Sequence, residues 1–289
     1  MKVALYSRRR GEEDLQFIHT VIEHLKQQGV EIVLHCNCRN ADDSCNAFFD
    51  SYVSLQQSLP IDFLISFGGD GSFIDAVNLV GDLDIPLVGI NTGRIGFLAG
   101  IKKDNYKECF QMLMQHQYTI EKRSLLHMES SVPHMLPGNF VVNDLTVRAT
   151  DSDSIIAVTV WAGDQKINTY WGDGLIIATP TGSTAYSMSC GGPILHPLTQ
   201  VHVLTPIAAH SLNVRPLVIP ADIPLTIEVQ GRSGKYSLQT DTEKYVMNEN
   251  VKLFLRKEKF HTNTVLFENS NFYDIIREKL LWGIDKRNA

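Results

Sequence analysis

Hydrophobic and polar positions follow one pattern in the first part of the chain and another after about residue 119. In the first part, short apolar runs such as 2–7 and 61–67 alternate with segments whose apolar residues are three or four apart, such as 12–29. These spacings predict strands that alternate with amphipathic helices, an arrangement typical of a parallel sheet built from βαβ units. We therefore predict a Rossmann-like α/β domain over residues 1–118.

The second part has short segments in which apolar and polar residues often alternate, as in 139–150 and 165–172. Strands at this spacing, separated by turns, predict a mainly antiparallel β domain over residues 119–269. Helical spacing returns at about 270–289 and predicts a tail helix. Packing of this helix against the first domain is one alternative. Its expected apolar set is Ile275, Ile276, Leu280 and Trp282.

Composition narrows the class of protein. The 289 residues are 44% hydrophobic and 20% charged, which suits one large or two smaller globular cores. The formal net charge of −6 argues against nucleic acid or an anionic membrane as a partner. We find neither a signal peptide nor the ~20 consecutive apolar residues of a membrane span, and the five cysteines form no CxxC pair. We expect a reduced, cytoplasmic protein.

The first candidate ligand-binding motif is "ISFGGDGSF", residues 65–73, where an apolar run ends in three glycines around Asp70. Glycines at the carboxyl end of a parallel strand let the backbone approach a ligand, and the following helix start suits phosphate oxygens. The Asp70 carboxylate is able to bind a divalent cation, to accept a proton from a hydroxyl, or to accept a hydrogen bond from a ribose. The plainer interpretation, a tight turn with Asp70 as a helix cap, is equally consistent with this motif alone.

A second dense stretch, "WGDGLIIATPTGSTAYSMSCGGPILHP", covers residues 171–197. Asp173 and Gly174 precede an apolar strand, which ends in a run of hydroxyl side chains around Gly182. These hydroxyls are suited to hydrogen bonding with phosphates and sugars, and the ring of Tyr186 is suited to stacking on a base. A β-hairpin connection is the plainer alternative. The hydroxyl side chains are those of Thr179, Thr181, Ser183, Thr184 and Ser187.

Four motifs together resemble the NAD kinase family. They are "GGDGSF" at 68–73, "PLVGINTGRIGFL" at 86–98, "ND" at 143–144 and "DGLIIATPTGSTAYSMSCGGPIL" at 173–195. The resemblance implies an α/β domain and a β domain with NAD in the cleft between them. It also implies transfer of a phosphoryl group from ATP, or from polyphosphate, to the 2′-hydroxyl of the adenosine ribose of NAD, giving NADP. Mg²⁺ or another divalent cation and a homodimer or homotetramer are implied as well.

The same resemblance implies roles for individual residues. Asp70 matches the family's proposed proton acceptor, and Gly71 lies beside it against the ligand. Asn143 and Asp144 match an NAD-contacting pair whose acid can hydrogen-bond a ribose diol, and Asp173 matches another dinucleotide contact. The segment expected to enclose the adenosine half comprises Thr181, Thr184, Ala185, Tyr186, Ser187, Met188 and Ser189.

Three positions depart from the family pattern and leave some contacts open. Asp75 and Trp171 stand where relatives carry basic or polar residues, and Glu243 stands where some relatives have a glutamine contact. Two further basic sites, Arg8–Arg10 and Arg94, are either phosphate contacts or ordinary surface and structural residues. The sequence does not decide between ATP and polyphosphate, between NAD and NADH, or which metal is preferred.

Two other classes of function compete with this one. A GGDG kinase acting on a lipid or a sugar phosphate would lack the adenosine-enclosing motif, and a lipid kinase would need a membrane-binding segment. A non-catalytic NAD sensor would have little need of Asp70. Formation of NADP in the presence of NAD, ATP and Mg²⁺ separates both classes from an NAD kinase.

Overall fold

The computed structural model describes residues 1–8, 11–34, 60–93, 96–136, 138–151, 155–267 and 271–282. The chain forms two compact units. Unit 1 comprises residues 1–122 and 262–289, and unit 2 comprises residues 123–261. The chain passes between the units twice, within the long strands β6 (Tyr118–Ser130) and β17 (Leu253–Phe267).

Unit 1 is built on a parallel sheet. Its strands run in the order β2–β1–β3–β4, with β5 beside β4, and Thr264 near the end of β17 pairs with Leu87 of β4. Every residue of β3 and β4 is buried, as expected for strands covered on both faces. The predicted parallel α/β fold is confirmed. The strands are β1 (Lys2–Ser7), β2 (Glu31–Leu34), β3 (Phe63–Phe67), β4 (Leu87–Asn91) and β5 (Ile101–Lys102).

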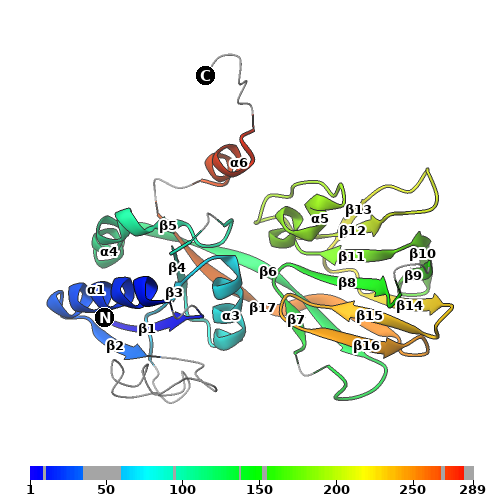
Figure 1. Ribbon diagram of the computed structural model, residues 1–289, viewed down its shortest axis with the longest axis horizontal. Helices are drawn as coiled ribbons and strands as arrows, with labels where there is room; N and C mark the ends of the chain where they lie inside the picture. Colours follow the sequence, from blue (N-terminus) through cyan, green and yellow to red (C-terminus); the bar gives the residue numbers. More distant parts are fainter. Residues whose placement is uncertain are drawn as a thin grey trace. The chain divides into compact units, whose positions relative to one another are not determined.

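The described residues of unit 1 also form the α-helices α1 (Glu12–Gln27), α3 (Asp70–Val80), α4 (Tyr106–Met114, after the short turn η2, Lys103–Asn105) and α6 (Phe272–Leu280) (Figure 1). The buried positions of α1 recur every three or four residues, and α1 and α4 share one hydrophobic core with the sheet. A left-handed glycine, Gly29 (φ +72°), follows α1 at the predicted stop.

Helix α6 departs from its predicted apolar face. Of the four residues expected to be buried, Ile276 is buried, whereas Trp282 is 59% exposed. The side chain of Glu278 pairs with Lys102 at 2.6 Å, and the Lys279 ammonium lies 5.2 Å from the centre of the Phe97 ring. Polar contacts therefore connect α6 to other parts of unit 1.

Unit 2 consists of antiparallel strands, as predicted. One set has the order β10–β9–β14–β17, with β6 paired to β17 and β7, and the other has the order β13–β12–β11–β8–β15–β16. Apolar residues from both sets form one core. The strands are β7 (Phe140–Val141), β8 (Asp144–Ala149), β9 (Ile156–Ala162), β10 (Gln165–Gly172), β11 (Gly174–Ala178), β12 (Val201–Ile207), β13 (Leu217–Pro220), β14 (Leu225–Gly231), β15 (Lys235–Gln239) and β16 (Lys244–Asn248).

Several strand assignments differ from the sequence pattern. The segment 139–150 is interrupted at Val142 and Asn143, which separate β7 from β8. Strands β12 and β16 were not predicted, and β17 runs on to Phe267. In β12 most residues are buried between β11 and β13, so pairing with neighbours, rather than a local alternation, makes this segment a strand.

Candidate functional site

The glycine–aspartate loop joins β3 to α3 in unit 1. Gly68 has φ +140°, and a Cβ atom there would come within 2.2 Å of the Ser72 hydroxyl, so this position requires glycine. Gly69 is the N-cap of α3 and has φ −93° with open space around it. Positive φ is therefore required at Gly68 and not at Gly69.

Asp70 is the first residue of α3, and backbone N–H groups hold its carboxylate. Phe97 donates to Oδ2 at 2.7 Å, and Leu98 and Ala99 donate to Oδ1 at 2.9 and 3.4 Å. A Cβ atom on Gly96 would lie 1.9 Å from that carboxylate, so glycine at 96 keeps the space that Asp70 fills. The turn 96–99 thus fixes the orientation of Asp70, a role that our sequence analysis did not assign to it.

Asp75, one of the departures from the family pattern, is neutralised within unit 1. Its carboxylate accepts a hydrogen bond from the Tyr6 hydroxyl at 3.0 Å and lies 3.5 Å from the Arg8 guanidinium. Burial and the neighbouring Asp75 charge raise the pKa of Tyr6. Arg8 also lies beside Gly71, 3.4 Å from where a Cβ atom would be. Arg9, Arg10 and Arg94 lie outside the described residues.

In unit 2, the Asn143–Asp144 turn packs directly on the segment that follows β11. The Thr179 hydroxyl donates to the Val142 carbonyl at 2.6 Å, and the Thr179 N–H donates to the Asn143 carbonyl at 2.9 Å. A Cβ atom on Gly182 would come within 2.0 Å of the Asn143 carbonyl oxygen. Two of the predicted motifs, 143–144 and 173–195, are therefore in contact.

Two partly buried carboxylates lie at this turn. Burial and the Asp241 charge raise the pKa of Asp144 to about 7, although the Thr146 hydroxyl donates to Asp144 at 3.0 Å and favours its ionised form. Asp241 accepts hydrogen bonds from the N–H groups of three consecutive residues, Val142 to Asp144. Asp241 was not among the predicted site residues, because in the sequence it is one acid in a polar turn.

The raised pKa of Asp144 leads to a prediction about stability. An ordinary aspartate titrates near 3.8, so between about pH 4 and pH 7 the folded chain holds one proton more than the unfolded chain. The free energy of unfolding therefore falls as pH rises through this window. Asp144→Asn removes this dependence, so we expect the variant to exceed the wild type in unfolding free energy at pH 8, by on the order of 1–4 kcal/mol, and to be similar at pH 4. Urea unfolding at both values measures it, and an equal difference at both values would contradict it.

The segment expected to enclose adenosine is helical, and it joins the antiparallel neighbours β11 and β12, so it is a long hairpin connection that contains helical turns. It forms the turn η3 (Thr181–Thr184) and the short helix α5 (Tyr186–Ser189). Several hydroxyls that we predicted as ligand donors serve the fold instead: Ser183 bonds to the Pro180 carbonyl at 2.6 Å, and the buried Ser187 bonds to Thr205 at 2.8 Å. Those two hydroxyls are therefore already engaged within the chain.

Other members of this segment are more available. Tyr186 is 37% exposed, and Ala185, Met188 and Ser189 are partly or fully exposed. The Thr184 hydroxyl donates to the Thr181 carbonyl at 3.2 Å, and the buried Thr181 hydroxyl has no hydrogen-bond partner among the described residues. Burial raises the pKa of the Tyr186 hydroxyl and that of the Cys190 thiol next to it.

Asp173 lies apart from the other candidates of unit 2. Strand β11 pairs Gly174 with Arg148 and Ala178 with Asp144, so Asp173 and Asp144 are at opposite ends of the strand pair. Five residues of strand correspond to roughly 16 Å. One copy of unit 2 therefore does not bring Asp173 to Asp144.

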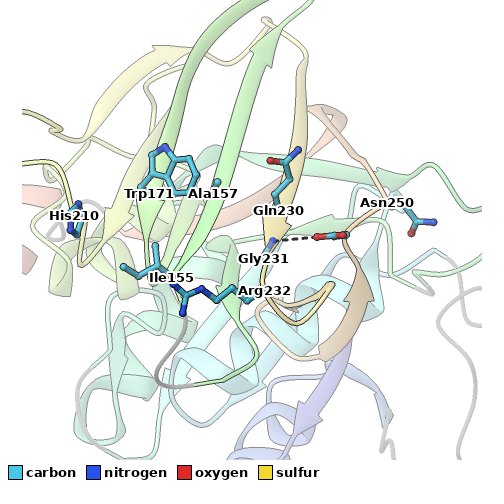
Figure 2. Close-up of a pocket in the computed structure, with 9 residues that line it drawn as sticks. Ile155, Ala157, Trp171, His210, Gln230, Gly231, Arg232 and Asn250 are labelled. Carbon is cyan, nitrogen blue, oxygen red and sulfur yellow. Dashed lines mark hydrogen bonds between the residues drawn. The ribbon is translucent and has the colours of Figure 1, made fainter.

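A hollow of about 800 Å³ lies where β9 begins and β10 and β14 end (Figure 2). Trp171 lines it and is 56% exposed, whereas no candidate site residue is part of its lining. The position that is basic in some relatives thus carries an apolar ring. The lining residues are Ile155, Ala157, Trp171, His210, Gln230, Gly231, Arg232, Glu249 and Asn250.

The described ranges contain no group of three His, Cys, Asp or Glu side chains that could hold a metal ion. Asp70 supplies a single carboxylate, so this residue does not form a resident metal centre by itself. Among the helices that the structure describes, none is long and apolar enough to cross a membrane.

Family models match most of the chain. Residues 7–118 match the ATP-NAD kinase N-terminal domain, and residues 142–265 match the ATP-NAD kinase C-terminal domain. An NAD kinase of Cytophaga hutchinsonii is 34% identical over 292 residues, and one of Flavobacterium psychrophilum is 38% identical over 297 residues. Each alignment covers 100% of both proteins.

Solved structures show the same fold. A yeast NADH kinase in complex with NADH has a TM-score of 0.87 at 21% identity, covering 100% of this chain and 90% of the yeast chain. An Archaeoglobus fulgidus NAD kinase in complex with ATP has a TM-score of 0.73 at 22% identity, covering 96% and 99%. At these identities the likeness concerns the fold alone.

Proposed function

Because the chain belongs to the NAD kinase family, we propose that it transfers the terminal phosphoryl group of ATP to the 2′-hydroxyl of the adenosine ribose of NAD, forming NADP. The observation that carries this proposal is the Asp70 carboxylate, held by three N–H groups at the first residue of α3. An ionised carboxylate has about four acceptor sites, so Asp70 keeps the capacity to accept the hydroxyl proton.

The chemistry that we assign to this chain is positioning and proton transfer. Asp70 takes the proton of the attacking 2′-hydroxyl, and the start of α3, with Gly71, offers N–H groups to phosphate oxygens. Phosphoryl transfer needs no covalent intermediate with the protein. A divalent cation, Mg²⁺ by preference, enters with ATP as part of the substrate and neutralises its phosphates.

The dinucleotide contacts are assigned to unit 2. We propose that Asn143 and Asp144 hydrogen-bond ribose hydroxyls and that the 181–189 segment encloses adenosine. The buried, unpartnered hydroxyl of Thr181 and the exposed ring of Tyr186 support this assignment. Asp173 is also proposed as a contact. Its distance from Asp144 favours a homodimer or homotetramer in which a second copy supplies it, and sedimentation analysis tests this assembly.

The stacking role of Tyr186 yields a second prediction. Tyr186→Ala is expected to weaken NAD binding by about 1–3 kcal/mol, the loss typical of a base that no longer stacks on an aromatic ring. Tyr186→Phe is the matched control, because it keeps the ring and removes only the hydroxyl beside Cys190. Calorimetric titration with NAD measures both variants, and equal affinity of Tyr186→Ala and wild type would exclude stacking.

A matrix of initial rates tests the choice of substrates. ATP and polyphosphate serve as donors, NAD and NADH as acceptors, and the divalent cation is varied in each combination. We expect the highest rate with ATP, NAD and Mg²⁺. A higher rate with NADH would assign the enzyme to NADH phosphorylation, and a lack of phosphorylated dinucleotide in every combination would overturn the proposed function.

A further inference from the structure

Asp241 occupies the turn that joins β15 to β16. The turn is closed by the Thr240 N–H, which donates to the Glu243 carbonyl at 2.9 Å, and by the Glu243 N–H, which donates to the Thr240 hydroxyl at 3.1 Å. These bonds fix the backbone on both sides of Asp241. Its carboxylate is consequently presented from a rigid position in unit 2.

The Asp241 carboxylate binds the backbone of the Asn143–Asp144 turn. Oδ2 accepts the Val142 N–H at 2.6 Å, Oδ1 accepts the Asp144 N–H at 3.2 Å, and both oxygens lie 3.1 Å from the Asn143 nitrogen. Successive N–H groups that converge in this way form a concavity suited to an anion. Here the anion is a side chain of the same protein.

The carbonyl side of the turn is held as firmly. Thr179 donates to the carbonyls of Val142 and Asn143, and Gly182 leaves no space for the turn to move toward η3. The turn is thus clamped between Asp241 on one side and the 179–182 segment on the other. Removing the Asp241 carboxylate would free one side of this clamp.

Charge is the second effect of Asp241 on this turn. Burial raises the pKa of Asp241, and its three N–H donors oppose this shift by favouring the ionised form, whereas Asp144 has a hydrogen bond from one hydroxyl, that of Thr146. A second negative charge beside Asp241 is unfavourable in this partly buried site. Among the described residues, the ionisable groups that interact with the Asp144 charge also include Tyr186 on α5 and Cys190 just after it, and both of these are in turn influenced by Arg148 on β8.

We propose that Asp241 is a positioning residue that clamps the Asn143–Asp144 turn of the dinucleotide site. Through its negative charge, Asp241 also determines the pH at which Asp144 becomes ionised and able to accept hydrogen bonds from ribose hydroxyls. This inference rests on the proposed NAD kinase activity. It is supported by the pKa of Asp144, which burial and the Asp241 charge raise to about 7.

The pH dependence of kcat/KM for NAD tests this role, because that ratio reports ionisations of the free enzyme. In the wild type it should fall about tenfold per pH unit below pH 7, as Asp144 takes up a proton. Asp241→Asn should move this acid limb down by about one pH unit, since it removes the neighbouring charge. Asp144→Asn should abolish the limb. Asp164→Asn, which removes an exposed carboxylate in the turn between β9 and β10, is the control and should leave the limb in place.

A merely structural role of Asp241 gives a different result. In that case Asp241→Asn would lower kcat/KM by one factor at every pH and leave the limb near pH 7, which would overturn the electrostatic part of the proposal. An unchanged profile and an unchanged KM would overturn the whole of it. If the wild type forms no NADP, the proposed NAD kinase activity itself is overturned. This result is distinguishable from a failure of the proposed role of Asp241, which is measured on an active wild type.

A measurement on the wild type covers the case in which Asp241→Asn does not fold. Carbon-13 NMR of the aspartate carboxyl groups follows each titration directly, and the resonance that is missing in Asp144→Asn identifies Asp144. We expect Asp144 to titrate near pH 7. Titration of Asp144 near the ordinary value of 3.8 would overturn the proposal.

Discussion

Asp70→Asn is expected to lower kcat at least about a hundredfold while the Kd for NAD changes by less than about tenfold. Asparagine has nearly the same size and keeps one acceptor oxygen, but it cannot take the proton of the 2′-hydroxyl. The contacts assigned to NAD in unit 2 are unchanged, so binding should be largely preserved. Steady-state rates and calorimetric titration with NAD measure the two effects separately.

Asp82→Asn is the matched control, because Asp82 lies just beyond the other end of α3 and is exposed. It should retain wild-type kcat. Thermal unfolding of both variants shows whether the lost N–H bonds to residues 97–99 alter the fold. If a folded Asp70→Asn variant keeps kcat within a few-fold of wild type, Asp70 is a helix-terminal structural residue and our assignment of the proton acceptor is wrong.

Gly182→Ala is expected to raise the KM for NAD at least about tenfold and to lower the unfolding free energy by about 1–3 kcal/mol. An alanine Cβ would lie 2.0 Å from the Asn143 carbonyl oxygen and 2.4 Å from its carbonyl carbon. These are backbone atoms, so the Asn143–Asp144 turn must shift and its proposed ribose contacts are lost.

The control for this variant is Gly138→Ala, also in unit 2, where an added Cβ atom meets nothing within 4 Å. It should leave both KM and stability close to wild type. Kinetics with NAD as the varied substrate and urea unfolding measure the two effects. Wild-type KM in Gly182→Ala would show that the contact between Gly182 and Asn143 has no part in dinucleotide binding.

The fold of unit 1 could be predicted from the sequence because its signals are local. Buried β3 and β4 are continuous apolar runs, α1 shows three-to-four spacing, and Gly29 marks its end. In unit 2 the antiparallel class was evident, whereas β12 and β16 depend on pairing with neighbouring strands and have weaker local signals.

The partners of the candidate residues could not be predicted in the same way. Asp70 stands out because it breaks a glycine run at a strand end, but its three N–H donors come from residues 97–99. Asp241 lies about a hundred positions from the turn that it holds and has no local feature that distinguishes it. The pattern of hydroxyls after β11 likewise could not show that Ser183 and Ser187 bond within the chain.

Mass spectrometry of the reaction products tests the central claim most directly. Purified protein is incubated with NAD, ATP and Mg²⁺, and the dinucleotide product is digested to locate its new phosphate. We predict NADP with the phosphate on the 2′-oxygen of the adenosine ribose, formed in equal amount with ADP. Tight binding of NAD with no phosphorylated product would contradict the account and identify the protein as a non-catalytic NAD sensor.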